Sequence, residues 1–177
     1  MKSISFLLFA FLFHSQTYAQ WNKIINSTIT FKIKNAGIWV KGSFTKSSIQ
    51  VSFDEVNLAQ SEFIGQIDAN SIQTGIKLRD NHLRDKEEFF YVKKHPTLTM
   101  KSVLITRKSP GIYTVKWSLS MKGITRLFSS DVHTLQEGNA LKFYTTFTIN
   151  RNDWNIGGSS FTMGDYVTIT LNTTVQK

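Results

Sequence analysis

The stretch YTVKWSLSM, residues 113–121, decides the fold class because apolar and polar side chains alternate along its whole length. The apolar side chains that share one face of the extended chain are Tyr113, Val115, Trp117, Leu119 and Met121. A period of two residues is typical of a strand that buries one face and exposes the other. The pattern therefore predicts a long strand in a sheet with one apolar side.

The same alternation recurs on both sides of this stretch, in residues 29–34, 49–53, 141–149 and 167–175. Candidate turns separate the runs. They are Gly37, Ser109-Pro110-Gly111, Gly123, Glu137-Gly138-Asn139 and Gly157-Gly158. The spacing indicates about eight strands, which suits an antiparallel barrel or a sandwich. We predict an all-β chain that forms an extended eight-stranded antiparallel β-barrel.

The interior of such a barrel has two possible states. Eight strands leave a lumen that side chains fill or that holds one slender ligand. Periodicity does not choose between them. The number of apolar and aromatic side chains exceeds what a filled barrel of this size packs readily, which favours a cavity.

One segment breaks the alternation. Residues 79–90, RDNHLRDKEEFF, are rich in charge, and we expect one short helix there. Asp80 is placed to cap it. Leu83, Lys86, Phe89 and Phe90 fall near one face at helical spacing.

The first residues predict export. Lys2 precedes an apolar run from Ile4 to Phe13, and Ala19 is a small residue before a cleavage point. This layout is typical of a secretory signal peptide, too short to span a bilayer. We predict a signal peptide over residues 1–19 and one domain over residues 20–177. No integral membrane segment is expected after cleavage.

Composition narrows the chemistry. The chain has no cysteine, so the exported domain must be held by its own core rather than by disulfides. The formal net charge is +9, but the lysines stand singly, and no basic run or motif points to nucleic acid. A basic balance of this size favours either anionic ligands and membrane surfaces or simple solubility, and we prefer a solubilising role because the lysines stand singly.

Several ordered blocks resemble the YceI-like family. They are Ser71-Ile72-Gln73-Thr74-Gly75, Arg79-Asp80-Asn81-His82-Leu83, Phe89-Phe90, His95-Pro96-Thr97 and Leu119-Ser120-Met121-Lys122-Gly123-Ile124-Thr125. Residues 27–37, 150–157 and 167–169 are similar to the family's first and last elements. The resemblance implies a lipocalin-like barrel of the bacterial periplasm. It also implies a long amphiphilic lipid of the isoprenoid or quinone type inside the barrel.

The chain departs from the family pattern at four positions. Tyr91 follows the paired phenylalanines where Asp is usual, Met100 replaces a common Phe, Trp117 stands near a usual Gly, and Trp154 takes a Phe position. Met100 and Trp117 fall on faces that can point inward, so they would reshape or shorten the lumen.

Apolar side chains are the candidates for ligand binding. The predicted lumen lining is Phe31, Trp39, Phe44, Phe89, Phe90, Met100, Tyr113, Trp117, Phe143, Phe147 and Trp154. Burial at about 25 cal/mol per Å² would supply the affinity for a chain without polar atoms.

The triplet Arg79, Asp80 and His82 has three interpretations. Acid–base catalysis needs a nucleophile partner, and the sequence shows none in a recognisable turn. A structural role is favoured, in which Asp80 caps the helix, Arg79 ties it to a strand end, and His82 satisfies a buried backbone group. Contact with a polar head group at the mouth of the barrel overlaps with that role.

A metal site is not expected, because the mature chain has three histidines without ligand spacing and no cysteine. No cofactor is expected either. We predict a periplasmic or secreted binding or carrier protein, not an enzyme, for a long-chain apolar or amphiphilic lipid; a homodimer is allowed. The alternative is a stress-related barrel with a filled core that acts through protein interactions.

Overall fold

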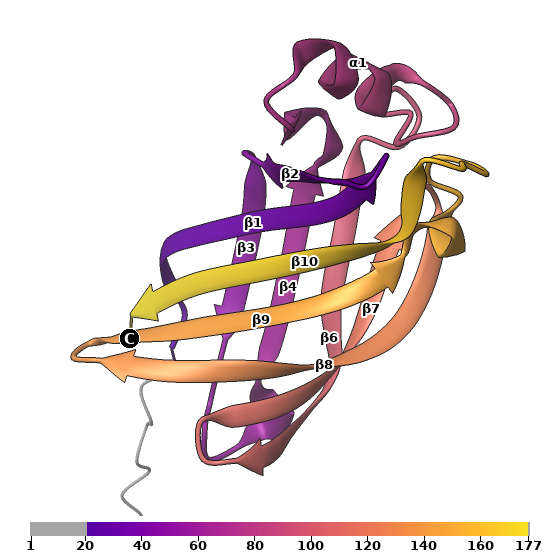
Figure 1. The fold of residues 1–177 in the computed structure, drawn as a ribbon. Coiled ribbons are helices and arrows are strands. Elements are labelled where there is room, and N and C mark those ends of the chain that lie inside the picture. The colour runs from indigo at the N-terminus through magenta and orange to yellow at the C-terminus, as the bar shows by residue number, and fades with distance from the viewer. Residues whose placement is uncertain (1–20, 177) are drawn as a thin grey trace, which may run out of the picture.

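The computed structural model describes residues 21–176, which form one curled antiparallel sheet (Figure 1). The strands are β1 (Lys23–Asn35), β2 (Ile38–Phe44), β3 (Ser47–Ser52), β4 (Glu62–Asp68), β5 (Ile72–Gln73), β6 (Thr97–Ser109), β7 (Ile112–Met121), β8 (Ile124–Glu137), β9 (Ala140–Asn150) and β10 (Met163–Gln176). Their order in the sheet is β3-β4-β6-β7-β8-β9-β10-β1-β2-β5. The helices are η1 (Leu58–Gln60), η2 (Ala69–Ser71), α1 (Lys77–Asp85) and η3 (Arg151–Trp154).

The predicted fold class is confirmed. All five alternating runs are strands, and the apolar face of β7 is buried along its whole length. The structure has ten strands rather than eight. One added strand is the two-residue β5, and the chain between residues 38 and 52 divides into β2 and β3 where it bends at Thr45 and Lys46. The predicted signal peptide, residues 1–19, lies outside the described residues.

The sheet curls round, and its two edges meet at a seam. At one end of the seam, Trp21 and Phe53 exchange backbone hydrogen bonds of 3.3 and 3.2 Å. At the other end, the β1–β2 ladder finishes at the pair Ile29 and Phe44, and the chain bends at Thr45 and Lys46 into β3. Between these points β1 and β3 lie along each other without pairing as strands. The barrel therefore closes at two points and not by a continuous ladder.

The predicted helix is shifted. Helix α1 spans Lys77–Asp85, and the expected range of 79–90 is wrong at both ends. The backbone becomes extended at Lys86, where the helix ends. The Phe90 backbone N–H then donates to the Leu83 carbonyl at 3.0 Å. Phe89 and Phe90 consequently fold back toward the barrel instead of continuing a helical face. Helix α1 lies across one end of the barrel, which we call the mouth (Figure 1).

The opposite end, which we call the floor, is closed by rings. The floor cluster consists of Phe53, Phe63, Tyr113 and Phe143, one from each of four segments. Phe53 packs edge-on against Tyr113 and Phe143 at centroid distances of 5.1 Å, and Phe63 lies 5.2 Å from Phe143. Edge-to-face rings at these distances add to the free energy gained by burial.

Candidate functional site

The first cavity of the lumen lies under α1, at the mouth. It has a volume of about 140 Å³ and an almost entirely apolar lining. Its main contributors are Phe31, Phe44, Leu83, Phe89, Phe90 and Ile169. A close approach shapes one wall, since a Cβ on Gly42 would lie 2.3 Å from the Phe31 ring. Glycine there lets the ring lie flat against the backbone of β2.

The second cavity, which we call the inner cavity, lies deeper. Its volume is about 90 Å³, and its lining is again almost wholly apolar. Met100, Trp117 and Phe143 contribute to it, together with Ile29 of β1 and Ile49 of β3. The inner cavity therefore adjoins both the floor cluster and the seam.

Consecutive inward positions of the same strands line the two cavities. On β10, Leu171 lines the inner cavity and Ile169 lines the mouth cavity. On β9, Phe147 stands between the two and is buried. Leu119 of β7 has the same intermediate position, between Trp117 and Met121. Phe147 and Leu119 thus lie between the two cavities along the lumen.

Ten of the eleven predicted lining residues divide into three groups. Phe31, Phe44, Phe89 and Phe90 line the mouth cavity, and Met100, Trp117 and Phe143 line the inner cavity. Tyr113, Phe147 and Trp154 are buried but line neither. The Trp154 indole instead donates from Nε1 to the Leu119 carbonyl at 3.2 Å.

The assignment of Trp39 to the lumen is wrong. Its side chain is 49% exposed, and the ammonium groups of Lys32 and Lys34 lie 5.1 and 5.3 Å from its ring centroid. Trp39 pairs with Lys34 across the β1–β2 hairpin, so both side chains point outward. The next residue, Val40, points into the mouth cavity.

Arg79 and Asp80 anchor α1 to the chain that precedes it. The Thr74 hydroxyl and backbone N–H both donate to the Asp80 carboxylate, the latter at 2.8 Å. Arg79 donates from Nε to the Thr74 hydroxyl at 2.7 Å and from Nη2 to the Thr74 carbonyl at 2.8 Å. Arg79 therefore ties the helix to the end of β5, as predicted. Asp80 lies inside the first turn and bonds to the preceding loop, so it is not the predicted cap.

His82 does not fit the predicted structural role. Its side chain is exposed on α1 and makes no hydrogen bond within residues 21–176. Arg79 and His82 consequently differ, because Arg79 lines the mouth cavity and His82 does not.

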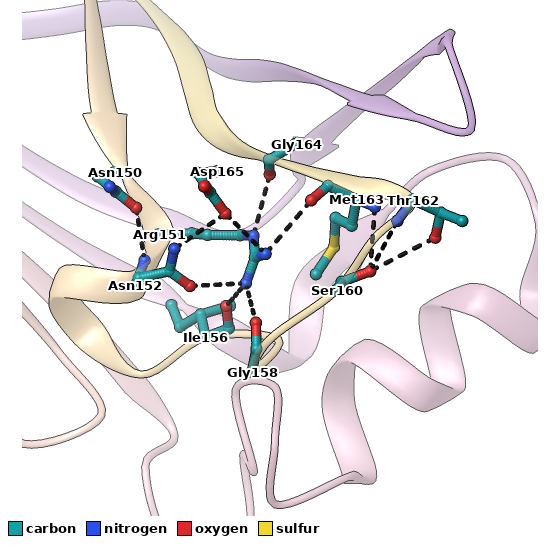
Figure 2. A network of polar contacts seen from close by, with 10 residues as sticks. All are labelled: Asn150, Arg151, Asn152, Ile156, Gly158, Ser160, Thr162, Met163, Gly164 and Asp165. Carbon is teal, nitrogen blue, oxygen red and sulfur yellow. Dashed lines mark hydrogen bonds and ion pairs between the residues drawn. The ribbon is translucent and has the colours of Figure 1, made fainter.

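Arg151 is the site residue that sequence reasoning missed. It is 2% exposed and lines the mouth cavity. Its guanidinium donates to the carbonyl groups of Ile156 and Gly158, each at 2.7 Å, and to the Gly164 carbonyl at 3.0 Å (Figure 2). Its Nη2 also forms an ion pair with Asp165 at 3.1 Å. Every nitrogen of this guanidinium is occupied, so Arg151 holds the β9–β10 loop in place.

Two further contacts hold the mouth together. The Lys122 ammonium donates to the Glu87 carbonyl at 2.8 Å and to the Asn155 carbonyl at 2.7 Å. The Gly157 N–H donates to the Glu88 carbonyl at 2.5 Å. A Cβ on Gly157 would lie 2.2 Å from Met163 and 3.2 Å from Phe89, and its φ is +82°, so this position requires glycine.

Burial lowers the pKa of Lys122, and the carboxylate of Glu87 opposes this effect. The turn that carries Lys122 has positive φ at Lys122 and Gly123, +48° and +75°, as a tight two-residue hairpin requires. The lysine of the LSMKGIT block is therefore positioned by its turn to join two loops of the mouth.

Polar atoms in the wall of the inner cavity are satisfied. The Trp117 indole donates to the Ser130 hydroxyl at 2.9 Å, and this hydroxyl lies 3.1 Å from that of Thr145. The Thr145 hydroxyl donates to the Asp131 carbonyl at 2.7 Å. No buried polar side-chain atom in residues 21–176 lacks a partner, so the lumen offers a ligand apolar surface.

The described residues contain no group of three or more His, Asp or Glu side chains that could hold a metal ion. Within the same residues, no helix is long and apolar enough to cross a membrane.

Sequence comparison identifies relatives over most of the chain. The YceI-like domain matches residues 24–175. A UPF0312 protein of Yersinia enterocolitica is 36% identical over 112 residues, which cover 63% of this chain and 57% of the relative. A UPF0312 protein of Pectobacterium atrosepticum is 32% identical over 135 residues, which cover 72% of this chain and 69% of that relative. The aligned part thus spans little more than half the length of the Yersinia relative.

Solved structures have the same fold. BcnA of Burkholderia cenocepacia superposes with a TM-score of 0.79 at 26% identity, covering 84% of this chain and 95% of that one. A polyisoprenoid binding domain of Saccharophagus degradans superposes with a TM-score of 0.69, covering 89% and 98%, and its 14% identity speaks for the fold alone. With the domain match over residues 24–175, these likenesses show that the chain belongs to the YceI-like family.

Proposed function

We propose that this protein binds a long-chain amphiphilic lipid of the isoprenoid or quinone type, with the chain in the lumen and the head group at the mouth. The observation that carries the proposal is the tube itself, two apolar cavities on consecutive positions of the same strands. Such a lumen selects by shape and apolar area, because a prenyl chain offers no polar atoms. A solved neighbour described as a polyisoprenoid binding domain supports this cargo.

Arg79 is our candidate for the residue that contacts the lipid head group. Its Nε and Nη2 are bonded to Thr74, while Nη1 has no hydrogen-bond partner within residues 21–176 and the side chain lines the mouth cavity. Arg151 lines the same cavity but is fully occupied by its own loop. An oxygen-bearing head group would therefore meet Arg79.

We further propose that export removes residues 1–19 and delivers the barrel to the periplasm, where it carries or sequesters its lipid without chemical change. The apolar leader and the family support this location. Homodimer formation stays a prediction, which light scattering at increasing protein concentration tests.

The test is native mass spectrometry of the protein purified from its own host, followed by solvent extraction. We expect a discrete additional mass that extracts as a long-chain lipid. An unliganded mass, with no uptake of offered prenyl alcohols, prenyl phosphates or quinones, would contradict the proposal and favour a filled barrel that acts through protein partners.

Two variants locate the cargo. Phe147→Ala removes buried bulk between the two cavities and should shift retained lipids to bulkier or longer chains, whereas Leu127→Ala, on the exposed face of β8, should not. Arg79→Gln should weaken retention of lipids with anionic head groups. Arg84→Gln is the matched control, because Arg84 also lies on α1 but outside the cavity lining.

A further inference from the structure

A patch of exposed apolar and basic side chains lies on the outer surface beside the mouth. We call it the basic rim. Its apolar members are Trp39, Phe161 and Tyr166, and its basic members are Lys32, Lys34 and Lys41. None of these side chains contributes to the buried core, so the core does not account for them.

Three contacts make the basic rim continuous. Lys32 pairs with Lys41 across the β1–β2 hairpin, and Lys34 pairs with Trp39. The hairpin tip is joined to the β9–β10 loop, since the Ala36 N–H donates to the Thr162 carbonyl at 2.8 Å. That bond brings the fully exposed ring of Phe161 beside the hairpin. Tyr166 lies on β10, which pairs with β1.

Charge is segregated along the chain in a way that favours this surface. Residues 21–53 contain five lysines and no Asp or Glu, whereas residues 54–88 contain eight of the 12 acidic residues. The acid nearest to Tyr166 in sequence, Asp165, is paired with Arg151. Lys32, Lys34 and Lys41 form no ion pair within residues 21–176, so the basic rim presents three cations to solvent. The acids of residues 80–88 lie on or just after α1 at the mouth (Figure 1).

We propose that the basic rim docks on the surface of an anionic phospholipid bilayer. Lysines beside an anionic membrane contribute attraction, and exposed aromatic side chains favour the level of the head groups. The inner face of the same hairpin lines the mouth cavity through Ile33 and Val40. Docking would thus bring the mouth of the lumen to the bilayer. The proposal concerns the outer surface and stands independently of the lipid proposed for the lumen.

The test is co-sedimentation of the full chain, expressed and processed in its host, with two kinds of vesicle. One is pure phosphatidylcholine, and the other contains about one third phosphatidylglycerol, which gives it a negative surface potential. We expect binding to the second kind, weakened by added salt because salt screens the attraction. Equal binding to both kinds, or to neither, would overturn the proposal.

Trp39 reports contact directly, because it is the exposed member of the four tryptophans while Trp21, Trp117 and Trp154 are buried. Lipids with brominated chains should quench its emission when the anionic vesicles bind. A Trp39→Phe variant should bind comparably but show no such quenching. Quenching that persists in this variant would place the contact elsewhere.

Matched substitutions test the residues. The double variant Lys32→Gln with Lys34→Gln should partition about thirtyfold less onto anionic vesicles, given about 1 kcal/mol of attraction expected per lysine. The control double variant Lys101→Gln with Lys116→Gln removes the same charge from β6 and β7 and should change partitioning much less. An equal loss in both would reduce the effect to net charge and overturn the assignment to the rim.

A separate pair of variants tests the contribution of the exposed aromatic ring of Phe161 to vesicle binding. Phe161→Ser should weaken binding several-fold without loss of fold, because this ring is fully exposed. Leu127→Ser, on the exposed face of β8, is the control. The lipid extracted from all these variants should match that of the parent protein. Vesicle binding lost with the cargo retained separates this surface from the lumen.

Discussion

The floor and the mouth close the same barrel by different physical means. At the floor, four rings carried mainly by strands pack on one another, with Phe53 central among Phe63, Tyr113 and Phe143. At the mouth, Arg151 and Lys122 donate to backbone carbonyl groups of loops. Rings packed in a core lose buried apolar area when they separate, whereas loops tied by hydrogen bonds exchange those bonds for water. We therefore expect a ligand to enter the lumen through the mouth.

Removal of the central floor ring should have the largest effect on stability. Phe53→Ala leaves a cavity among the remaining rings and should lower the free energy of unfolding by about 4 kcal/mol. Urea titration measures this change. A loss below about 1 kcal/mol would mean that the rings do not form a cooperative unit.

Breaking the mouth network should cost somewhat less and act locally. Arg151→Met leaves the carbonyl groups of the β9–β10 loop without their donor, and we expect a loss of about 3 kcal/mol. Hydrogen exchange should increase first in residues 155–165. Uniform acceleration throughout the sheet would show that mouth and floor are not separate units.

Lys122→Met removes a smaller link, the one between the Glu87 and Asn155 carbonyl groups. We expect a loss of about 1 kcal/mol and faster uptake of lipid, because two loops of the mouth are released. Stopped-flow fluorescence with an offered prenyl lipid measures the rate. Unchanged uptake would place entry elsewhere.

Alkaline pH should have the smallest effect on the floor, through Tyr113. Burial raises the pKa of the Tyr113 hydroxyl, the carboxylate of Glu55 adds to this, and Arg107 opposes it. Because the folded-state pKa lies above that of the unfolded chain, the contribution to stability is complete below pH of about 10 and is lost as pH rises through the folded value. Urea midpoints should therefore fall faster above this pH in the native protein than in Tyr113→Phe.

Alternation predicted the strands that keep one apolar face, and it failed where both faces are apolar. In β8, Leu127 and Leu135 are exposed while Val132 is buried, so the sequence loses its period. Strand β6 contains a register shift between Ser102 and Leu104, so inward positions are even-numbered before it (Leu98, Met100) and odd-numbered after it (Ile105). Such features depend on neighbouring strands and leave no regular pattern.

The site was predicted in part for similar reasons. Trp39 was placed in the lumen by its residue type, although the run from Ile38 to Phe44 alternates and puts Trp39 with Lys41 on the outer face. Arg151 had no such signal, because its acceptors come from a loop that folds around it. Family resemblance marked the block around Arg151 without indicating this role.

The seam between β1 and β3 determines how the width of the tube is fixed. A ring closed throughout by ladder hydrogen bonds has a set circumference, because widening it breaks those bonds. Here β1 and β3 are joined by the Trp21–Phe53 bridge at one end and, at the other, by the bend at Thr45 and Lys46 that leads from the β1–β2 ladder into β3, with unpaired strand between them. Side-chain packing across the seam, through Ile29 and Ile49, sets the bore. A guest that replaces this packing can dilate the tube while every strand keeps its partners.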